Sequence, residues 1–262
     1  MVKDYHMHPN LIRTSEERFD TFVRSALDRH LDEICITDHM PLSCSNAGDR
    51  IPQGKVKEYC EAVRAMAEKY RPLISIKLGI EIDYHESVSD EIEAVLASGD
   101  FDYIIGASHL HVIANGDIRK IAATRNGYVD ATLRNTIEAA KTGYFDTIAH
   151  IDLFRWIFDN PVRFPLEDDG YCEERHMELI EETLDAIKSS GVRLEVNSHT
   201  AEPDSVTRAY PSVKILQLAL EKGLKFSYGS DAHIPERVGY PLDALKAHPV
   251  YGKAIAQWEN EG

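Results

Sequence analysis

Long apolar runs are absent from this sequence. None of its hydrophobic stretches approaches the length that a bilayer-spanning helix needs, and residues 1–8 lack the apolar segment of a secretory signal. We therefore expect a cytoplasmic protein with no membrane partner. The hydrophobic fraction of 43% nevertheless excludes a disordered chain, because it provides enough apolar surface for a sizeable core.

Basic residues are also in short supply. The chain has 29 Lys and Arg against 44 Asp and Glu, which gives a formal net charge of −15, and it contains no basic run. Such a surface repels a phosphate backbone at long range. We expect no nucleic-acid partner, although a local cationic site could still bind a small anion.

Cysteine is sparse and irregularly spaced. The four copies are Cys35, Cys44, Cys60 and Cys172, and no two of them form a C-x-x-C pair. Thiolate metal sites and disulfide frameworks both need more cysteines or closer spacing than this. The sequence therefore predicts free thiols in a reducing compartment.

Short strand-like segments alternate with longer amphipathic segments along the whole chain. The predicted strands, rich in aliphatic and aromatic residues, are 2–7, 33–37, 74–80, 103–107, 146–149, 193–196 and 225–228. The predicted helices are 15–30, 55–70, 89–97, 128–141, 173–189 and 211–222. This alternation predicts an α/β fold with a parallel strand core, and residues 1–262 are expected to form a single domain because no linker divides them.

Local signals mark several boundaries of these elements. Thr14 and Glu17 fit a capping box at the start of the first helix. Gly143, Gly191 and Gly223 each follow a helical segment with Lys in its last turn, which is typical of a helix end. The segment 159–171, which contains two prolines and an acidic run, is the best candidate for a loop insertion.

Side chains that can bind metal follow every predicted strand. In chain order they are His6 and His8, Asp38 and His39, Glu81 and Asp83, His109 and His111, His150 and Asp152, Asn197 and His199, and Asp231 and His233. The carboxyl ends of the strands in an α/β barrel face one mouth, where the active site lies. Any one of these residues has an ordinary structural explanation, but the coincidence at seven strand ends favours a shared site. Imidazoles and carboxylates without thiolates suit Zn²⁺, Mn²⁺ or Fe²⁺.

Not every histidine or acidic residue of the chain is expected to bind metal. The histidines outside the strand ends are expected to be structural, and they are His30, His85, His176 and His248. His111 is interpreted as a residue that supports a ligand or faces the substrate. Asp38 is expected to orient a ligand imidazole rather than to bind metal itself.

The order of the motifs resembles the polymerase and histidinol phosphatase (PHP) superfamily of metal-dependent phosphoesterases, and especially its monofunctional histidinol-phosphate phosphatase branch. The matching segments are 5–8, 36–41, 78–81, 105–109, 149–155, 194–197 and 229–233, so the resemblance covers nearly the whole chain. It implies a distorted (β/α)7 barrel with two to three divalent metal ions, either Zn, Mn or Fe. It also implies hydrolysis of L-histidinol phosphate or of another small phosphorylated metabolite.

The resemblance further implies roles for individual residues. One ion would be bound by His6, His8, Glu81 and Asp231, a second by Glu81, His109 and His150, and a third by His39 and His233. Glu81 would thus bridge two ions. Arg155 matches a position that is expected to contact the substrate phosphate.

The sequence departs from the family pattern at two places. No histidine follows the H-x-H motif near Thr14 to complete the third ion site, which is therefore expected to bind weakly. Residues 198–204 replace a stretch that usually ends in a basic residue. His199 in this stretch is interpreted either as a substitute ligand or substrate contact, or as a loop histidine that faces water.

The implied chemistry is a metal-assisted displacement at phosphorus. A water held between two cations can lose a proton near neutral pH and attack in line, with Glu81, Asp231 and His233 as the expected catalytic residues. The general acid is open between His233, His199 and a metal-bound water.

Two alternative functions are a metal-dependent amidohydrolase and a non-catalytic metal-binding module. The amidohydrolase barrel uses eight strands, whereas this sequence predicts seven, and the nearly intact ligand set argues against the module. The sequence makes no prediction of the oligomeric state.

Overall fold

The computed structural model describes residues 1–45 and 48–261, and in this part of the chain seven parallel strands form one sheet in chain order. The strands are β1 (Lys3–Asp4), β2 (Glu33–Ile36), β3 (Ser75–Asp83), β4 (Tyr103–Ala107), β5 (Thr147–Ile148), β6 (Arg193–Asn197) and β7 (Phe226–Gly229). A parallel bridge between Met7 and Ala232 joins the segments that follow β1 and β7. The sheet is thereby nearly closed, which confirms the expected distorted (β/α)7 barrel.

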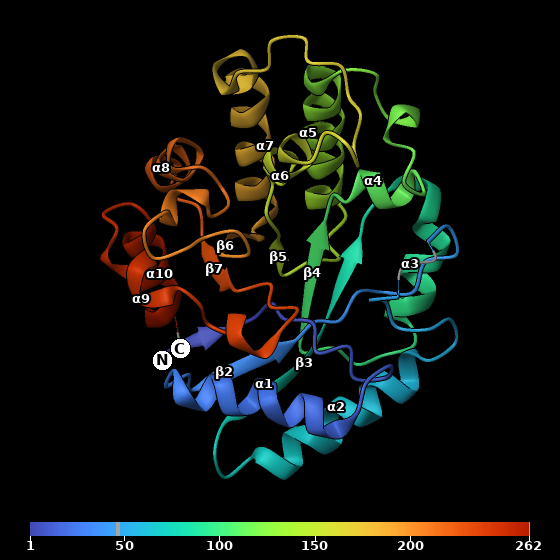
Figure 1. The fold of residues 1–262 in the computed structure, drawn as a ribbon, viewed down its shortest axis with the longest axis vertical. Helices are drawn as coiled ribbons and strands as arrows, with labels where there is room; N and C mark the ends of the chain where they lie inside the picture. The colour runs from blue at the N-terminus through green and yellow to red at the C-terminus, as the bar shows by residue number, and fades with distance from the viewer. Residues whose placement is uncertain (46–47, 262) are drawn as a thin grey trace.

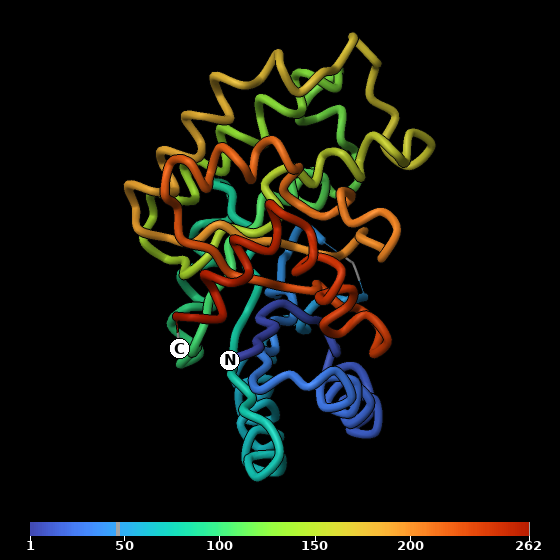
Figure 2. Tube along the Cα trace, turned by 90° about the vertical axis from the view of Figure 1, so that its left-hand side faces the viewer, coloured from blue at the N-terminus to red at the C-terminus, as the bar shows by residue number. Residues whose placement is uncertain are grey.

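Helices surround the strands on the outside of the barrel (Figure 1). They are α1 (Glu16–Asp28), α2 (Val56–Tyr70), α3 (Ser89–Leu96), α4 (Leu110–Ile113), α5 (Arg125–Lys141), α6 (Phe154–Asp159), α7 (Met177–Ser190), α8 (Val213–Lys222), α9 (Leu242–Ala247) and α10 (Tyr251–Asn260). The chain ends lie close together beside α10, where Lys3 Nζ donates a hydrogen bond to the backbone oxygen of Glu261 (Figure 2).

Helix α1 illustrates how the sequence pattern produces this packing. Its residues Phe19, Phe22, Val23 and Ala26 recur at helical spacing and are buried against the barrel, as expected. The predicted capping box is wrong by one residue, because the N-cap is Ser15, whose hydroxyl accepts a hydrogen bond from the Arg18 N–H. The Thr14 hydroxyl instead donates to the backbone oxygens of Pro9 and Asn10.

The strands and the helix-ending glycines follow the sequence prediction, whereas several short helices do not. All seven predicted strands are present, and Gly143, Gly191 and Gly223 have φ values of +75°, +75° and +73° at the predicted helix ends. Segment 160–172 has no helix or strand, although Phe154–Asp159 before it is helical. The short helices α4, α6 and α9 and the C-terminal α10 were not predicted.

The cysteines and the lengths of the helices relate to two expectations drawn from composition. All four cysteines are free thiols, and Cys35 among them is buried. No helix in residues 1–45 and 48–261 is both long and apolar enough to cross a membrane.

Candidate metal centre

The eight residues that the resemblance assigns to metal binding converge at the carboxyl ends of the strands. Their elements are the segments after β1, β2, β4, β5 and β7 and the end of β3, and the residues are His6, His8, His39, Glu81, His109, His150, Asp231 and His233. The centroid of the His8 ring lies 4.2 Å from that of the His39 ring and 4.5 Å from that of the His233 ring. The strand-end pattern in the sequence therefore marks a single cluster.

Glu81 lies at the centre of this cluster and is fully buried. Its Oε1 atom is 3.2 Å from Nε2 of His150, 3.5 Å from Nε2 of His6 and 3.9 Å from Nε2 of His109. Its Oε2 atom is 2.5 Å from Nδ1 of His39 and 3.6 Å from Nε2 of His8. The carboxylate of Glu81 thus contacts imidazoles of both ion sets that it is expected to bridge, His6 and His8 of the first and His109 and His150 of the second.

Asp231 is the second carboxylate of the cluster, and its backbone is in the left-handed region, with φ of +53°. Its Oδ1 atom lies 3.2 Å from Nε2 of His8. Its backbone oxygen lies 3.1 Å from Nδ1 of both His199 and His233, so each of these rings donates its Nδ1–H to the same acceptor. The Nε2 atom of each ring is thereby left to accept a proton or a metal ion.

Two further carboxylates orient imidazoles by contacting Nδ1, the ring nitrogen that faces away from Glu81. Glu195 Oε1 lies 2.6 Å from Nδ1 of His6, and Asp83 Oδ1 lies 2.7 Å from Nδ1 of His109. A carboxylate in this position fixes the tautomer of a metal-binding histidine and raises its basicity. Asp83 was predicted as one of the strand-end residues that can bind metal, but here it orients a ligand ring, and Glu195 was not predicted at all. Their spacing of two from Glu81 and Asn197 places each pair on one face of a strand.

Asp38 has a different role from the one predicted. Its carboxylate accepts the backbone N–H groups of Asn10 and Leu11 at 2.8 and 3.0 Å, and no described imidazole donates to it. It therefore holds the loop after His8 instead of a ligand ring.

Electrostatics keep the two central carboxylates ionised. Burial favours a higher pKa for Glu81, but the imidazoles of His39, His6 and His109 outweigh burial and hold its pKa well below the ordinary value. Burial acts in the same direction on Asp231, and the surrounding histidines again hold its pKa well below the ordinary value. Negative charge is thus maintained where cations would bind.

Several buried donor atoms test whether the site fits metal ions. Among the described residues, the buried side-chain atoms that form no hydrogen bond include His6 Nε2, both ring nitrogens of His8, and also His39 Nδ1 and Glu81 Oε2, which lie close together without hydrogen-bond geometry. Buried polar atoms without partners are costly, and a bound cation would satisfy them. Triplets of ligand atoms within 4.8 Å of one another include His6, His8 and Glu81, and also Glu81, His109 and His150. The residues present therefore fit more than one divalent ion.

A third triplet of imidazoles lies at the expected third ion site, which has no histidine near Thr14 to complete it. His8 lies within the same 4.8 Å limit of His39 and His233. His39 and His233 therefore share this triplet with His8, a residue that the resemblance assigns to the first ion, and the triplet itself contains no carboxylate.

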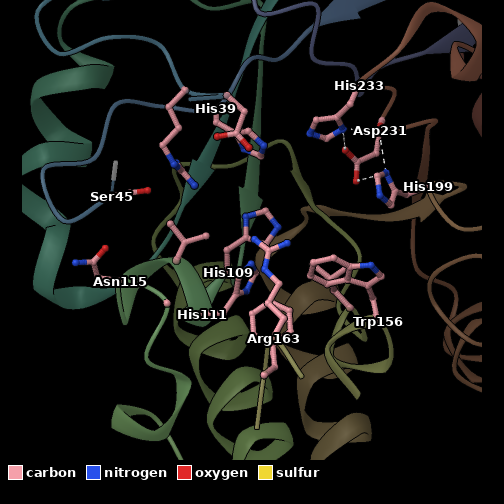
Figure 3. A pocket seen from close by; sticks show the side chains of 16 residues that line it. His39, Ser45, His109, His111, Asn115, Trp156, Arg163, His199, Asp231 and His233 are labelled. Carbon is pink, nitrogen blue, oxygen red and sulfur yellow. Dashed lines mark hydrogen bonds and ion pairs between the residues drawn. The ribbon is translucent and has the colours of Figure 1, made fainter. Parts of the chain in front are cut away.

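A cavity of about 530 Å³ opens onto the cluster (Figure 3). Its walls include His39, His109, Asp231 and His233 from the cluster, together with His111 and His199. His199 thus lines the cavity, and its side chain is 36% exposed. Burial and the neighbouring His109 lower the pKa of His111 to about 3, so this ring is neutral in the cavity wall.

Arg155 does not line this cavity. Its Nε atom lies 2.9 Å from Oδ2 of the buried Asp152, its Nη2 donates to the backbone oxygen of Ala209, and its guanidinium stacks on Tyr210 at 4.8 Å. The predicted phosphate contact is therefore not what the structure places there. The reason is local, because Asp152, three residues earlier and just before α6, forms an ion pair with the guanidinium.

Another arginine does reach the cavity. Arg163 lines it together with Trp156 and Phe164. These three residues belong to no sequence motif, because they lie in or beside the predicted loop insertion 159–171.

Comparison with known proteins places this geometry among its relatives. The family model described as PHP domain matches residues 4–199. A probable histidinol-phosphatase from Deinococcus radiodurans is 29% identical over 254 residues, which cover 93% of this chain and 91% of that protein. A histidinol-phosphatase from Lactococcus lactis is 24% identical over 241 residues, which cover 89% of this chain and 85% of that protein.

Solved structures show the same architecture. The crystal structure of histidinol phosphate phosphatase from Lactococcus lactis, complexed with zinc, L-histidinol and phosphate, superimposes with a TM-score of 0.76. The two sequences are 23% identical, and the match covers 97% of this chain and 93% of that one. A putative histidinol phosphatase from Listeria monocytogenes matches with a TM-score of 0.71 at 21% identity, over 92% of this chain and 98% of that one. At these identities the likeness establishes the shared fold.

Proposed function

Because the chain belongs to the PHP domain family, we propose that it is a metal-dependent phosphatase that hydrolyses L-histidinol phosphate to L-histidinol and phosphate. The observation that carries this proposal is the position of Glu81, whose buried carboxylate lies among the imidazoles of both tight ion sets, where ring nitrogens of His6 and His8 have no hydrogen-bond partner. Relatives named for this activity support the choice of substrate.

We assign the ions to the ligand sets that the resemblance implies. His6, His8, Glu81 and Asp231 would hold the first ion, Glu81, His109 and His150 the second, and His39 and His233 the third. When bound, such ions offset the charge of the phosphate and make water acidic enough to act as a nucleophile at neutral pH.

The protein itself supplies orientation and proton placement. Glu195 and Asp83 hold the Nδ1 protons of His6 and His109, so that both Nε2 atoms face Glu81. The backbone oxygen of Asp231 does the same for His199 and His233, which leaves the Nε2 atoms of these two rings available on the cavity wall.

We further propose that the enzyme acts in the cytoplasm on a small metabolite. The four free thiols are typical of a reducing compartment. The net charge of −15 disfavours a nucleic-acid substrate, and the cavity of about 530 Å³ has the size of a small-molecule site.

A screen of phosphate release tests the function directly. The protein, loaded with Mn²⁺ or Zn²⁺, is assayed on a panel of phosphorylated metabolites that includes L-histidinol phosphate, with amide and lactone substrates as the comparison. We expect kcat/KM for L-histidinol phosphate to exceed that for the other monoesters by about tenfold or more. Faster turnover of another monoester would correct the substrate, and hydrolysis of amides or lactones alone would overturn the reaction class.

A further inference from the structure

We propose that Arg163 binds the phosphoryl group of the substrate, the contact that the sequence pattern predicts for Arg155. The inference rests on the proposed function, because it assumes that the cavity receives a phosphate ester. Three features of the described structure support it: the charge of the cavity wall, the way the loop holds Arg163, and the packing of its guanidinium.

The cavity wall contains two arginines, and they differ in what they contact. Arg50 is 3% exposed, and its guanidinium is ion-paired with Asp83 and donates to the backbone oxygen of Met40. Within residues 1–45 and 48–261, no side chain forms an ion pair with Arg163, and no hydrogen bond from its guanidinium is found. Arg163 is therefore the cavity arginine whose donors are free for a ligand.

The backbone of Arg163 is fixed by a tight turn after α6. The backbone oxygen of Asn160 accepts the N–H groups of Arg163 and Phe164 at 3.1 and 2.9 Å. The Asn160 side chain in turn donates to the backbone oxygen of Trp156 at 2.8 Å. The buried side chain of Phe164 also fixes the turn, so the backbone position of Arg163 is well defined.

Two aromatic rings support the guanidinium itself. It lies 5.5 Å from the ring centre of Trp156 and 5.1 Å from that of Phe164. Figure 3 shows the side chain reaching into the cavity between the wall with His109 and His111 and the indole of Trp156. Stacking on aromatic faces leaves the N–H edge of a guanidinium free, and this edge matches two oxygens of a phosphate.

The position suits a phosphate dianion held at the metal cluster. Arg163 and the cluster residues His39, His109 and His233 line the same cavity, so a phosphate ester that enters it to reach the cluster meets the guanidinium in the same space. Charge-assisted, two-point contacts of this kind are strong and stabilise charge on the transferring group. In a chain of net charge −15, the unpaired arginine also offers a local attraction for the anion.

Three variants of the metal-loaded enzyme test the assignment. Arg163→Ala removes the guanidinium, Arg163→Lys keeps the charge but not the fork, and Arg134→Ala is the matched control. Arg134 is an exposed arginine on α5 that does not line the cavity. The readouts are kcat/KM for L-histidinol phosphate and for p-nitrophenyl phosphate, the dissociation constant of inorganic phosphate by calorimetry, and the metal content.

We expect Arg163→Ala to lower kcat/KM on both esters by about 100-fold and to weaken phosphate binding by about tenfold or more. Metal content should be unchanged, Arg163→Lys should recover part of the loss, and Arg134→Ala should match the wild type. Phosphate binding and kinetics of Arg163→Ala within about threefold of the wild type would overturn the proposal. A loss confined to L-histidinol phosphate, with phosphate binding intact, would also overturn it, because Arg163 would then contact the leaving group.

The measurement of inorganic phosphate binding distinguishes a failure of this proposal from a failure of the proposed function. If the wild type does not hydrolyse L-histidinol phosphate, that function fails, whereas weakened binding of inorganic phosphate by Arg163→Ala still supports the role of Arg163. Wild-type-like phosphate binding by the variant overturns the role whichever ester proves to be the substrate.

Discussion

Nδ1 of His6 lies 2.6 Å from Oε1 of Glu195, and both residues are buried. The contact determines which edge of the imidazole faces the cluster, because Nδ1 is engaged and Nε2 points to Glu81 and Asp231. Gly229 makes room for it: a Cβ at this position would come within 2.3 Å of Glu195 Oε1 and of the His6 Cβ. The packing of β6, β7 and the segment after β1 thus sets the orientation of one ligand.

The Glu195→Gln variant should weaken metal binding without unfolding the barrel. The amide still accepts a hydrogen bond but removes the negative charge that supports the basicity of the ring, and changes of this kind reduce metal affinity or activity about 10- to 100-fold. Chelator competition on the purified variant measures the affinity. The matched control is Glu174→Gln, an exposed residue paired with Lys214. A metal affinity of Glu195→Gln equal to that of the control would contradict the orienting role.

The Glu81→Ala variant should lose nearly all activity and more than one equivalent of tightly bound metal. Its carboxylate contacts imidazoles of both ion sets that it is expected to bridge, so its removal uncouples two ions and leaves their charge poorly balanced. Metal analysis and phosphatase assays on the same preparation provide the measurement. Retention of both the metal and the turnover would show that Glu81 does not bridge.

Much of the fold and of the cluster follows from local sequence patterns. Each strand is a short apolar run, and residues such as His39 and His150 come directly after the strand ends, so the topology of a parallel barrel brings them together. Helices as short as α4 and α6 carry too few periodic residues to be predicted. Tertiary contacts account for what the sequence did not reveal about individual side chains.

The two arginines of the α6 region illustrate that limit. The motif predicts a phosphate contact at Arg155, but the direction of a long side chain depends on its partners, and Asp152 with the Ala209 carbonyl holds this one inside. Arg163 belongs to no motif, and only the turn at Asn160 and the ring of Trp156 place it in the cavity.

The Arg155→Ala variant should therefore affect stability more than chemistry. Removing the guanidinium leaves the carboxylate of Asp152 buried without its partner, and the cost of breaking such a pair is about 3 kcal/mol in the free energy of unfolding. Urea denaturation of the metal-loaded protein measures the loss. We expect kcat/KM of the folded variant to stay within about threefold of the wild type. A 100-fold loss of kcat/KM at unchanged stability would restore the phosphate contact to Arg155.

Metal binding should release protons at neutral pH. Burial lowers the pKa of His6, but the carboxylates of Glu195, Asp231 and Glu81 outweigh it and raise this pKa well above the ordinary value in the metal-free site. His6 therefore carries a proton near pH 7 that a metal ion must displace, and the affinity for metal should fall as the pH falls through the raised pKa of His6.

Calorimetry of metal uptake in buffers of different ionisation enthalpy counts these protons. His8 provides the contrast, because burial and the nearby rings of His39 and His233 lower its pKa well below the ordinary value, so it binds without releasing a proton. At least about one proton should be released per protein at pH 7. Metal uptake with no proton release would contradict the raised pKa of His6.

The third ion should be held more weakly than the other two. The triplet of His8, His39 and His233 contains no carboxylate, and Nε2 of His8 lies 3.2 Å from Oδ1 of Asp231, which directs this ring to the first ion. His39 and His233 then remain as two imidazole ligands, whereas each of the other two assigned ligand sets includes at least one carboxylate. Exhaustive dialysis should leave about two equivalents of metal, and added metal should restore a third. His233→Ala should keep the two tight equivalents and fail to regain the third. Three equivalents retained through dialysis would mean that His8 or His199 completes the third site as a full ligand.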